Sequence, residues 1–156
     1  MTDRNATVTI RGERTVRLAD TPAVREEYGW ESRRFTIRCH TGRVVTGRWG
    51  GVPLGPAIEA ANFPDDTTHL LATGGDGHRA CVEVEPALGG LVGFVCEEID
   101  RGHDEEPDEE FEDDWQDTPR LLAPGIDSAR TVRDVVAIAA LSLSAEEDPE
   151  AYEAIT

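Results

Sequence analysis

The chain contains no lysine, so all 15 of its basic residues are arginine. Against them stand 32 aspartates and glutamates in 156 residues, which gives a formal net charge of −17. Nucleic acids and anionic membranes bind proteins by attracting cationic side chains, so we expect this chain to bind neither. A lysine-free, acidic surface favours a halophilic source, because salt screens the self-repulsion of the charges. A genome rich in GC would explain the missing lysine but leaves the excess of acid unexplained.

Long apolar segments and closely spaced cysteines are also missing. No run approaches the length of a membrane span, and residues 1–5 lack the apolar core of a signal peptide. Cys39, Cys81 and Cys96 form an odd set without the Cys-x-x-Cys spacing. This pattern argues against a disulfide framework and against a zinc knuckle. We therefore expect a cytoplasmic protein with reduced thiols, in which Cys81 and Cys96 belong to the core.

The negative charge is concentrated in one segment. Residues 97–117 hold thirteen acids and one arginine, whereas residues 1–96 hold twelve acids and eleven arginines. The acidic segment has too little apolar surface to offset the entropy that it would lose on ordering, so it is predicted to be a solvated loop. We expect one domain over residues 1–142 with this acidic loop insertion at 97–117, followed by an acidic C-terminal tail at 143–156.

Alternation of apolar and polar residues predicts a mixed, mainly β fold of the α+β class with short helices. Strands are expected as two pieces within residues 6–18 and at residues 35–39, 69–73 and 80–84. Short helices are expected to begin at Thr21-Pro22, where threonine caps and proline starts a helix, and at residues 54–62. Gly75-Asp76-Gly77 predicts a turn with a positive φ angle. Residues 131–142 are ambiguous, because their apolar spacing suits a helix.

Cys39 ends an alternating strand pattern that places it on the inward face with Phe35 and Ile37. Three further motifs follow this cysteine along the chain. They are Trp49-Gly50-Gly51-Val52-Pro53-Leu54, then Gly75-Asp76-Gly77-His78, then Thr118-Pro119-Arg120-Leu121-Leu122-Ala123-Pro124-Gly125 with Ser128-Ala129-Arg130-Thr131-Val132-Arg133. Together and in this order, the four pieces resemble the sulfite-oxidase-like molybdopterin-binding oxidoreductases. The resemblance covers most of residues 6–142 outside the acidic segment.

The resemblance implies a molybdenum-molybdopterin cofactor, with Cys39 as the protein's own ligand to the metal. It implies oxygen-atom transfer to or from a small oxo-compound, with an electron-transfer partner that the sequence does not identify. His78 stands where the family has a tyrosine near the substrate, so it is a candidate catalytic hydrogen-bond donor. Arg130 and Arg133 match the family's Arg-x-Val-Lys on the cofactor side of the pocket. The family fold also implies a strand at residues 131–142.

Five arginines lie between Ser32 and Trp49 with no acid among them, at positions 33, 34, 38, 43 and 48. Guanidinium forks match the geometry of phosphate, so the cluster predicts an anion-binding pocket. Under this hypothesis Arg43 and Arg48 hold the pterin phosphate, while Arg38 acts with His78 on the substrate anion. Positive charges near Cys39 would also lower its pKa and favour the thiolate. Alternatively, the arginines line the solvent face of a strand and pair with the acidic segment.

Two other function classes stay open. A non-catalytic module that retains the fold would use its arginines to hold an anion and its acidic segment to engage a basic partner. Little precedes residue 33 that matches the further pterin-contacting segments of typical family members, which favours this alternative. A zinc protein using Cys39, His40 and His78 is less favoured, because no pair of these ligands has the usual spacing.

Overall fold

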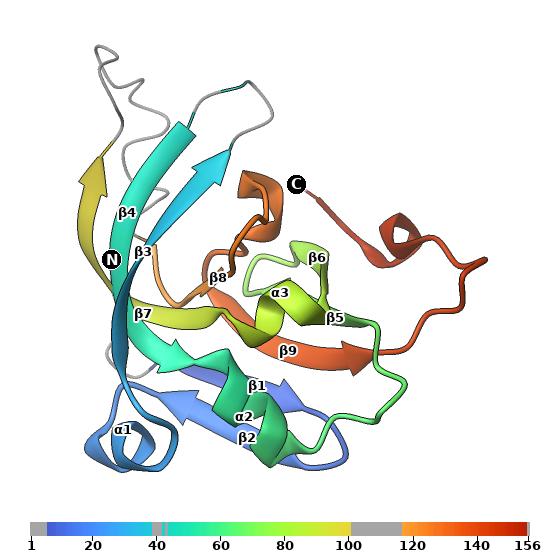
Figure 1. The fold of residues 1–156 in the computed structure, drawn as a ribbon, viewed down its shortest axis with the longest axis horizontal. Helices are drawn as coiled ribbons and strands as arrows, with labels where there is room; N and C mark the ends of the chain where they lie inside the picture. Colours follow the sequence, from blue (N-terminus) through green and yellow to red (C-terminus); the bar gives the residue numbers. More distant parts are fainter. Residues whose placement is uncertain (1–5, 39–41, 43, 101–116, 156) are drawn as a thin grey trace.

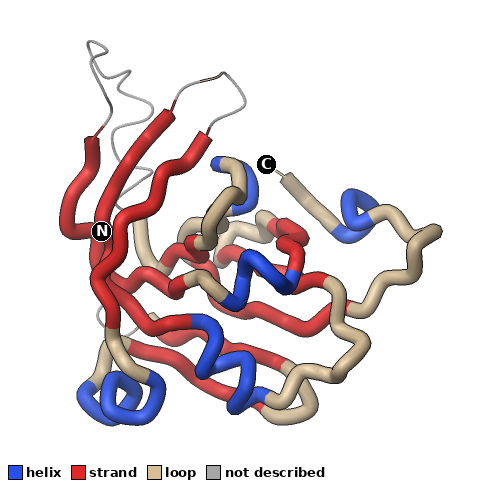
Figure 2. The backbone as a smooth tube through the Cα atoms, in the orientation of Figure 1, coloured by secondary structure: helices blue, strands red, loops and turns tan. Residues whose placement is uncertain are grey.

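The structure is a computed structural model that describes residues 6–38, 42, 44–100 and 117–155 (Figure 1). Its strands are β1 (Thr7–Arg11), β2 (Thr15–Ala19), β3 (Glu31–Arg38), β4 (Val44–Pro53), β5 (His69–Gly74), β6 (Arg79–Glu83), β7 (Leu91–Asp100), β8 (Arg120–Leu122) and β9 (Val135–Leu141). Its helices are α1 (Pro22–Tyr28), α2 (Leu54–Ala61) and α3 (Val84–Leu88), with 3-10 turns η2 (Ser128–Arg130) and η3 (Pro149–Tyr152). The described part is mainly β with short helices, as the sequence predicts (Figure 2).

The strands form two sheets. The five-stranded sheet has the order β2-β1-β9-β5-β6, in which β1 and β9 are parallel and the other neighbours are antiparallel. The four-stranded sheet has the antiparallel order β3-β4-β7-β8. In Figure 1, β3 and β4 rise steeply beside one end of the five-stranded sheet, whose strands run across the view. The end of β3 at Arg38 forms a bridge with Asp127, in the connection between β8 and β9.

The main hydrophobic core is built from both sheets. Its fully buried residues include Val8, Ile10, Val52, Leu70, Val92, Leu121 and Ile138. A second cluster contains Phe35, Ile37, Val45, Trp49, Leu91 and Leu122. Consecutive residues on a strand point to opposite faces, and the neighbours Leu91 and Val92 belong to different clusters. The four-stranded sheet is therefore apolar on both faces here, and burying each such side chain stabilises the fold by about 1.5–3 kcal/mol.

Local sequence signals account for several element boundaries. The hydroxyl of Thr21 accepts a hydrogen bond from the backbone N–H of Val24 at 3.2 Å, and Pro22 is the first residue of α1, as predicted. The predicted helix at residues 54–62 is α2, which ends where Asn62 adopts a left-handed conformation with φ 53°. The predicted turn after β5 has its positive φ at Gly77, 93°. On β3, Phe35 and Ile37 are buried while Arg34, Thr36 and Arg38 are exposed, as the alternation requires.

The structure corrects two secondary-structure expectations and resolves the ambiguity at residues 131–142. Residues 97–100 belong to β7 and are not loop, because they pair with β4, where Glu98 lies opposite Arg48. Val84 begins α3 and does not continue the preceding strand. The helical spacing in residues 131–142 is misleading: β9 lies between β1 and β5, as the family resemblance implies. Residues 101–116, the rest of the predicted acidic loop up to residue 117, lie outside the described residues.

The C-terminal residues return to the edge of the five-stranded sheet. Ala154 and Arg79 exchange two backbone hydrogen bonds, of 2.9 and 3.0 Å, so residues near the C-terminus lie beside β6. The turn η3 is capped by Asp148, whose carboxylate accepts from the N–H of Glu150 at 2.9 Å. None of the helices in the described ranges has the length and apolar character needed to cross a membrane.

Candidate functional site

The loop between β8 and β9, here called the 123–130 loop, is closed at its base by backbone pairing. The N–H of Leu121 donates to the carbonyl of Val132 at 3.0 Å, and Arg120 pairs with Arg133. Arg120 is only 3% exposed. Its guanidinium donates to the carbonyls of Thr131 at 3.1 Å and Asp117 at 3.3 Å. Buried carbonyls need such donors, so Arg120 fixes the base of this loop.

The tip of the 123–130 loop brings together segments that are far apart in the sequence. The loop starts from β8 at one edge of the four-stranded sheet, yet Asp127 pairs with Arg38 at the end of β3, the opposite edge strand. Nε2 of His78 lies 2.8 Å from the carbonyl oxygen of Ala129. Three of the four motif segments therefore meet at this tip: the end of β3, the turn with His78, and the segment before β9. Cys39, His40 and Arg43 lie outside the described residues.

His78 holds the loop by a hydrogen bond. A carbonyl oxygen can only accept, so Nε2 of His78 carries the proton and donates to Ala129. The backbone N–H of His78 donates in turn to the carboxylate of Asp76 at 3.0 Å, which fixes the turn. This geometry makes His78 a positioning residue for the loop tip, a role that the sequence motif does not reveal.

Arg130 is surrounded by carboxylates. Its Nη1 lies 2.7 Å from Asp127 and its Nη2 lies 2.8 Å from Glu153. The Glu153 side chain is only 5% exposed, and its second oxygen accepts the backbone N–H of Cys81 at 2.8 Å. Burial alone would lower the pKa of Arg130, but the charges of Asp127 and Glu153 outweigh burial and raise it. Arg130 is therefore charged and already paired, an arrangement that depends on the C-terminal residues reaching the sheet.

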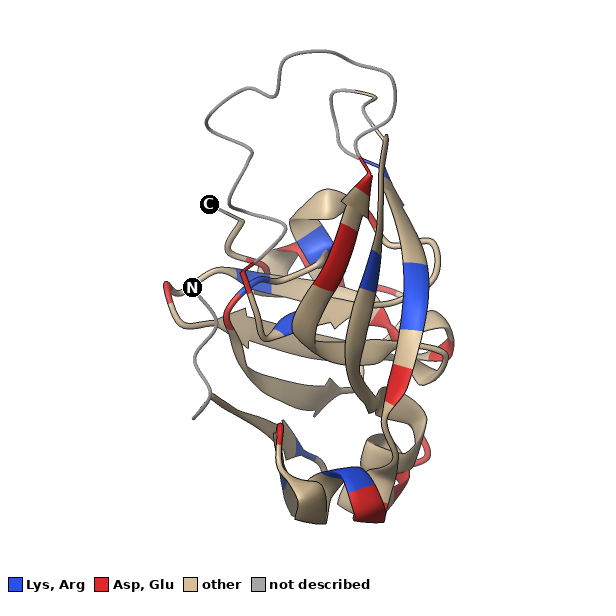
Figure 3. Cartoon of the chain, turned by 90° about the vertical axis from the view of Figure 1, so that its left-hand side faces the viewer, with Lys and Arg blue, Asp and Glu red and all other residues tan. Residues whose placement is uncertain are grey.

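The other predicted arginines differ in their surroundings. Arg133 lies 3.4 Å from Asp117, and Arg34 lies 3.5 Å from Glu98. Arg33 donates to the carbonyls of residues 89 and 90 at 2.7 and 2.8 Å. Arg34 thus pairs with a residue of the acidic segment, as the alternative interpretation of these arginines expects, and Arg33 lies 3.7 Å from Glu31 on its own strand. Figure 3 shows both basic and acidic residues on the strands of the four-stranded sheet.

Arg38 and Arg48 remain as candidate anion-binding residues. Neither has an ion-pair partner among the residues that the structure describes, and Arg38 is exposed while Arg48 is half-buried. The hydroxyls of Thr36 and Thr46 lie between them on the same face of the sheet, 3.1 Å apart. Both guanidinium groups are therefore available to an anion, whereas carboxylates already contact Arg130 and Arg133.

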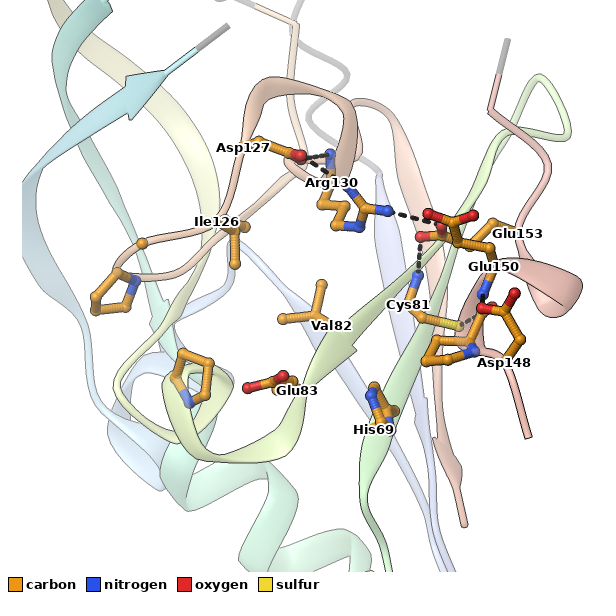
Figure 4. Close-up of a pocket in the computed structure, with 14 residues that line it drawn as sticks. His69, Cys81, Val82, Glu83, Ile126, Asp127, Arg130, Asp148, Glu150 and Glu153 are labelled. Atoms are coloured by element: carbon orange, nitrogen blue, oxygen red, sulfur yellow. Dashed lines mark hydrogen bonds and ion pairs between the residues drawn. The ribbon is translucent and has the colours of Figure 1, made fainter. Parts of the chain in front are cut away.

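A pocket of about 470 Å³ adjoins Arg130 (Figure 4). It is lined by β6, by the 123–130 loop and by residues 148–153 around η3, together with His69 of β5 and Pro86 of α3. Its titratable lining residues are His69, Cys81, Glu83, Asp127, Arg130, Asp148, Glu150 and Glu153. Within the described part of the chain, no three His, Cys, Asp or Glu side chains are arranged to hold a metal ion. Sequence reasoning missed this pocket, because its walls come from four separate stretches of the chain without a shared motif.

Cys81 and Cys96 match their predicted places to different degrees. Cys81 is 4% exposed and belongs to the core, as predicted. Cys96 is half-buried and packs against the second hydrophobic cluster. Burial raises the pKa of both thiols above the ordinary value. Both cysteines are therefore poor nucleophiles at neutral pH.

Comparison with known proteins gives a likeness to solved structures and none in sequence. No family model matches the sequence, and no curated protein matches it. Among solved structures, 14 chains match, including the sulfane dehydrogenase SoxCD from Paracoccus pantotrophus, with a TM-score of 0.66 at 14% identity. The alignment covers 94% of this chain and 41% of the SoxCD chain, so this chain spans less than half of that length. At this identity the likeness shows a shared fold: this chain has the fold of the matching part of SoxCD.

Proposed function

We propose that this chain is a molybdopterin-dependent oxidoreductase of the sulfite-oxidase-like type, in which Cys39 binds the metal. The observation that carries the proposal is the meeting of three motif segments at the tip of the 123–130 loop. The loop pairs with β3 at Arg38, the residue before Cys39 in the sequence, and it contacts the turn that carries His78. The fold shared with a sulfane dehydrogenase supports redox chemistry on a small sulfur compound.

In this proposal the arginines of β3 and β4 bind anions. Arg38 and Arg48 have guanidinium groups without ion-pair partners among the described residues. Together with Arg43 they would hold the phosphate of the pterin and the oxyanion of the substrate. When bound, molybdenum supplies the oxygen-atom transfer, while the protein contributes position and charge. The substrate is a small oxo-anion or oxo-compound, and electrons pass to a separate protein or carrier.

Arg130, Arg133 and His78 take positioning roles in this proposal. Both arginines already contact carboxylates, so a phosphate at these positions would have to share the guanidinium with that partner or displace it. His78 holds the loop through Ala129 and would act on the substrate only if this hydrogen bond opened. The cofactor set is thereby reduced from the sequence prediction to Cys39, Arg38, Arg43 and Arg48.

The proposal is tested by the metal and pterin content of the protein purified from a molybdenum-replete host. We expect one molybdenum per chain in the wild type, none in Cys39→Ser, and an unchanged content in the control Cys96→Ser. Cys96 is the matched control because it is a half-buried thiol without an assigned ligand role. An empty wild type, or a Cys39→Ser variant with full molybdenum, would contradict the proposal.

A second candidate function is a non-catalytic module that keeps the fold. The pairing of Arg130 and Arg133 with carboxylates favours it, because two of the predicted cofactor contacts are occupied by the protein itself. Such a module would still bind an anion at Arg38 and Arg48, or a basic partner through its acidic residues. Protein that contains molybdenum but shows no turnover with sulfur or nitrogen oxo-compounds would support this candidate.

A further inference from the structure

Two donors at the edge of the five-stranded sheet converge on a single carboxylate. The guanidinium of Arg130 and the backbone N–H of Cys81 each lie 2.8 Å from a different oxygen of Glu153. The side chain of Glu153 is 5% exposed, so this contact is almost closed to solvent. A guanidinium and a backbone N–H that each donate to a different oxygen of the same carboxylate form a carboxylate-binding site.

Both donors are held in place by residues other than Glu153. Asp127 binds Arg130 twice, through the guanidinium at 2.7 Å and through the backbone N–H at 3.1 Å. Cys81 is paired with Leu71 in the ladder between β5 and β6. The guanidinium of Arg130 and the N–H of Cys81 therefore keep their positions when Glu153 moves away. Without Glu153, the N–H of Cys81 and Nη2 of Arg130 lack a hydrogen-bond acceptor at a half-buried position. Such a site favours another anion in the place of Glu153.

The segment that carries Glu153 is held by few contacts. No residue between positions 142 and 155 is buried as a whole. Apart from Glu153, the attachments to β6 are the backbone pair between Arg79 and Ala154 and a contact from the thiol of Cys81 to the carbonyl of Pro149 at 3.4 Å. Segments without buried apolar side chains open at a small free-energy cost compared with the whole domain. Figure 1 shows this segment beside β6, joined to β9 by a connection that runs out from the body.

An external ligand has space to reach the two donors. The pocket of about 470 Å³ has Arg130 and Glu153 in its wall, and Figure 4 shows both side chains meeting at one side of it. We propose that Arg130 and the Cys81 amide form a binding site for a carboxylate ligand, and that residues 148–154 are its tethered internal ligand. An external carboxylate binds by displacing Glu153. This site needs no molybdenum, so it stands apart from the proposed oxidoreductase function.

Chemical rescue of the full chain tests the site. Glu153→Ala removes the internal carboxylate, and sodium acetate is the probe, compared with sodium chloride at equal ionic strength. We expect the Tm of Glu153→Ala to rise by about 3–6 °C at an acetate concentration ten times Kd. Glu150→Ala, which removes a neighbouring carboxylate that also lines the pocket, should show no such rise. The double variant Arg130→Gln/Glu153→Ala should show none either.

Two results of the rescue experiment would overturn the proposal. Acetate could shift the Tm of the wild type, Glu150→Ala and Glu153→Ala equally, or phosphate could rescue Glu153→Ala where acetate does not. If a variant does not fold, hydrogen exchange of the wild-type protein tests the proposal without any substitution. The amide of Ala154 should exchange with solvent at least about 100-fold faster than the amide of Ile138 in the central strand β9. Equal exchange rates would mean that the segment leaves only on global unfolding, and the internal-ligand role would be wrong.

Discussion

The hydrogen bond from His78 to the 123–130 loop can be removed with one substitution. In His78→Ala the carbonyl of Ala129 loses a donor at 2.8 Å in a half-buried place. A hydrogen bond of this kind contributes a net stabilisation of about 1 kcal/mol. For a domain of this length, the expected loss lowers the Tm by about 2–4 °C. The backbone contact from the N–H of His78 to Asp76 survives the substitution, so the turn itself stays folded.

Urea unfolding followed by circular dichroism measures this loss. We expect the midpoint to fall while the slope of the free energy against urea stays unchanged, because the substitution leaves the buried area of the fold as it was. His78→Gln is the matched control, since the side-chain amide of glutamine reaches about as far as Nε2 and can donate to the same carbonyl. Its midpoint should lie close to that of the wild type.

The stability and the kcat of the variants together distinguish whether His78 holds the 123–130 loop or donates to the substrate. If His78→Ala is as stable as the wild type, or if glutamine restores nothing, the hydrogen bond to Ala129 does not hold the loop and our reasoning fails. In molybdenum-loaded protein, a fully stable His78→Gln that loses about 100-fold or more in kcat would instead support a catalytic donor. Unchanged kcat would assign His78 to positioning alone.

Three further perturbations have defined outcomes. Gly51→Ala would place its Cβ 1.9 Å from the carbonyl oxygen of Val92, so the free energy of unfolding measured in urea should fall by at least about 1–3 kcal/mol. In the control Gly89→Ala, the atom nearest to the new Cβ is 3.6 Å away, so the free energy of unfolding should change by less than about 0.5 kcal/mol. Burial, helped by Glu153, raises the pKa of the Cys81 thiol above its ordinary value, so mass spectrometry after iodoacetamide at pH 8 should find Cys81 labelled in urea but not in the folded chain. With a net charge of −17, the Tm should rise between about 0.1 M and about 2 M KCl, and a flat profile would refute the halophilic interpretation.

Local patterns in the sequence were sufficient for much of the fold. The alternation around Phe35 and Ile37 placed them in the core, because a strand directs successive side chains to opposite faces. Thr21 and Pro22 set the start of α1 through a side-chain cap and a fixed φ angle. The positive φ of Gly77 follows from glycine's freedom from Cβ clashes. These features depend only on neighbours along the chain, so the sequence by itself determined them.

Secondary structure failed to follow local patterns where long-range pairing outweighed them. The spacing of the apolar residues in β9 suits a helix, yet hydrogen bonds to β1 and β5 on both sides make it a central strand. Glu98 reads as part of an acidic loop, but pairing with β4 makes it strand. Propensity contributes a few tenths of a kcal/mol per residue, which complete hydrogen bonding and burial in a sheet easily exceed.

The partners of charged side chains were decided by the tertiary structure alone. Arg130 was predicted to bind a cofactor, but the return of the chain to β6 delivers Glu153 to its guanidinium. The pairing of Arg34 with Glu98 joins strands that are far apart in sequence. An ion pair depends on distances of a few ångströms, and those distances follow from strand order and loop crossings. The sequence determined which cations this protein has, and only the fold decided which of them already had a partner.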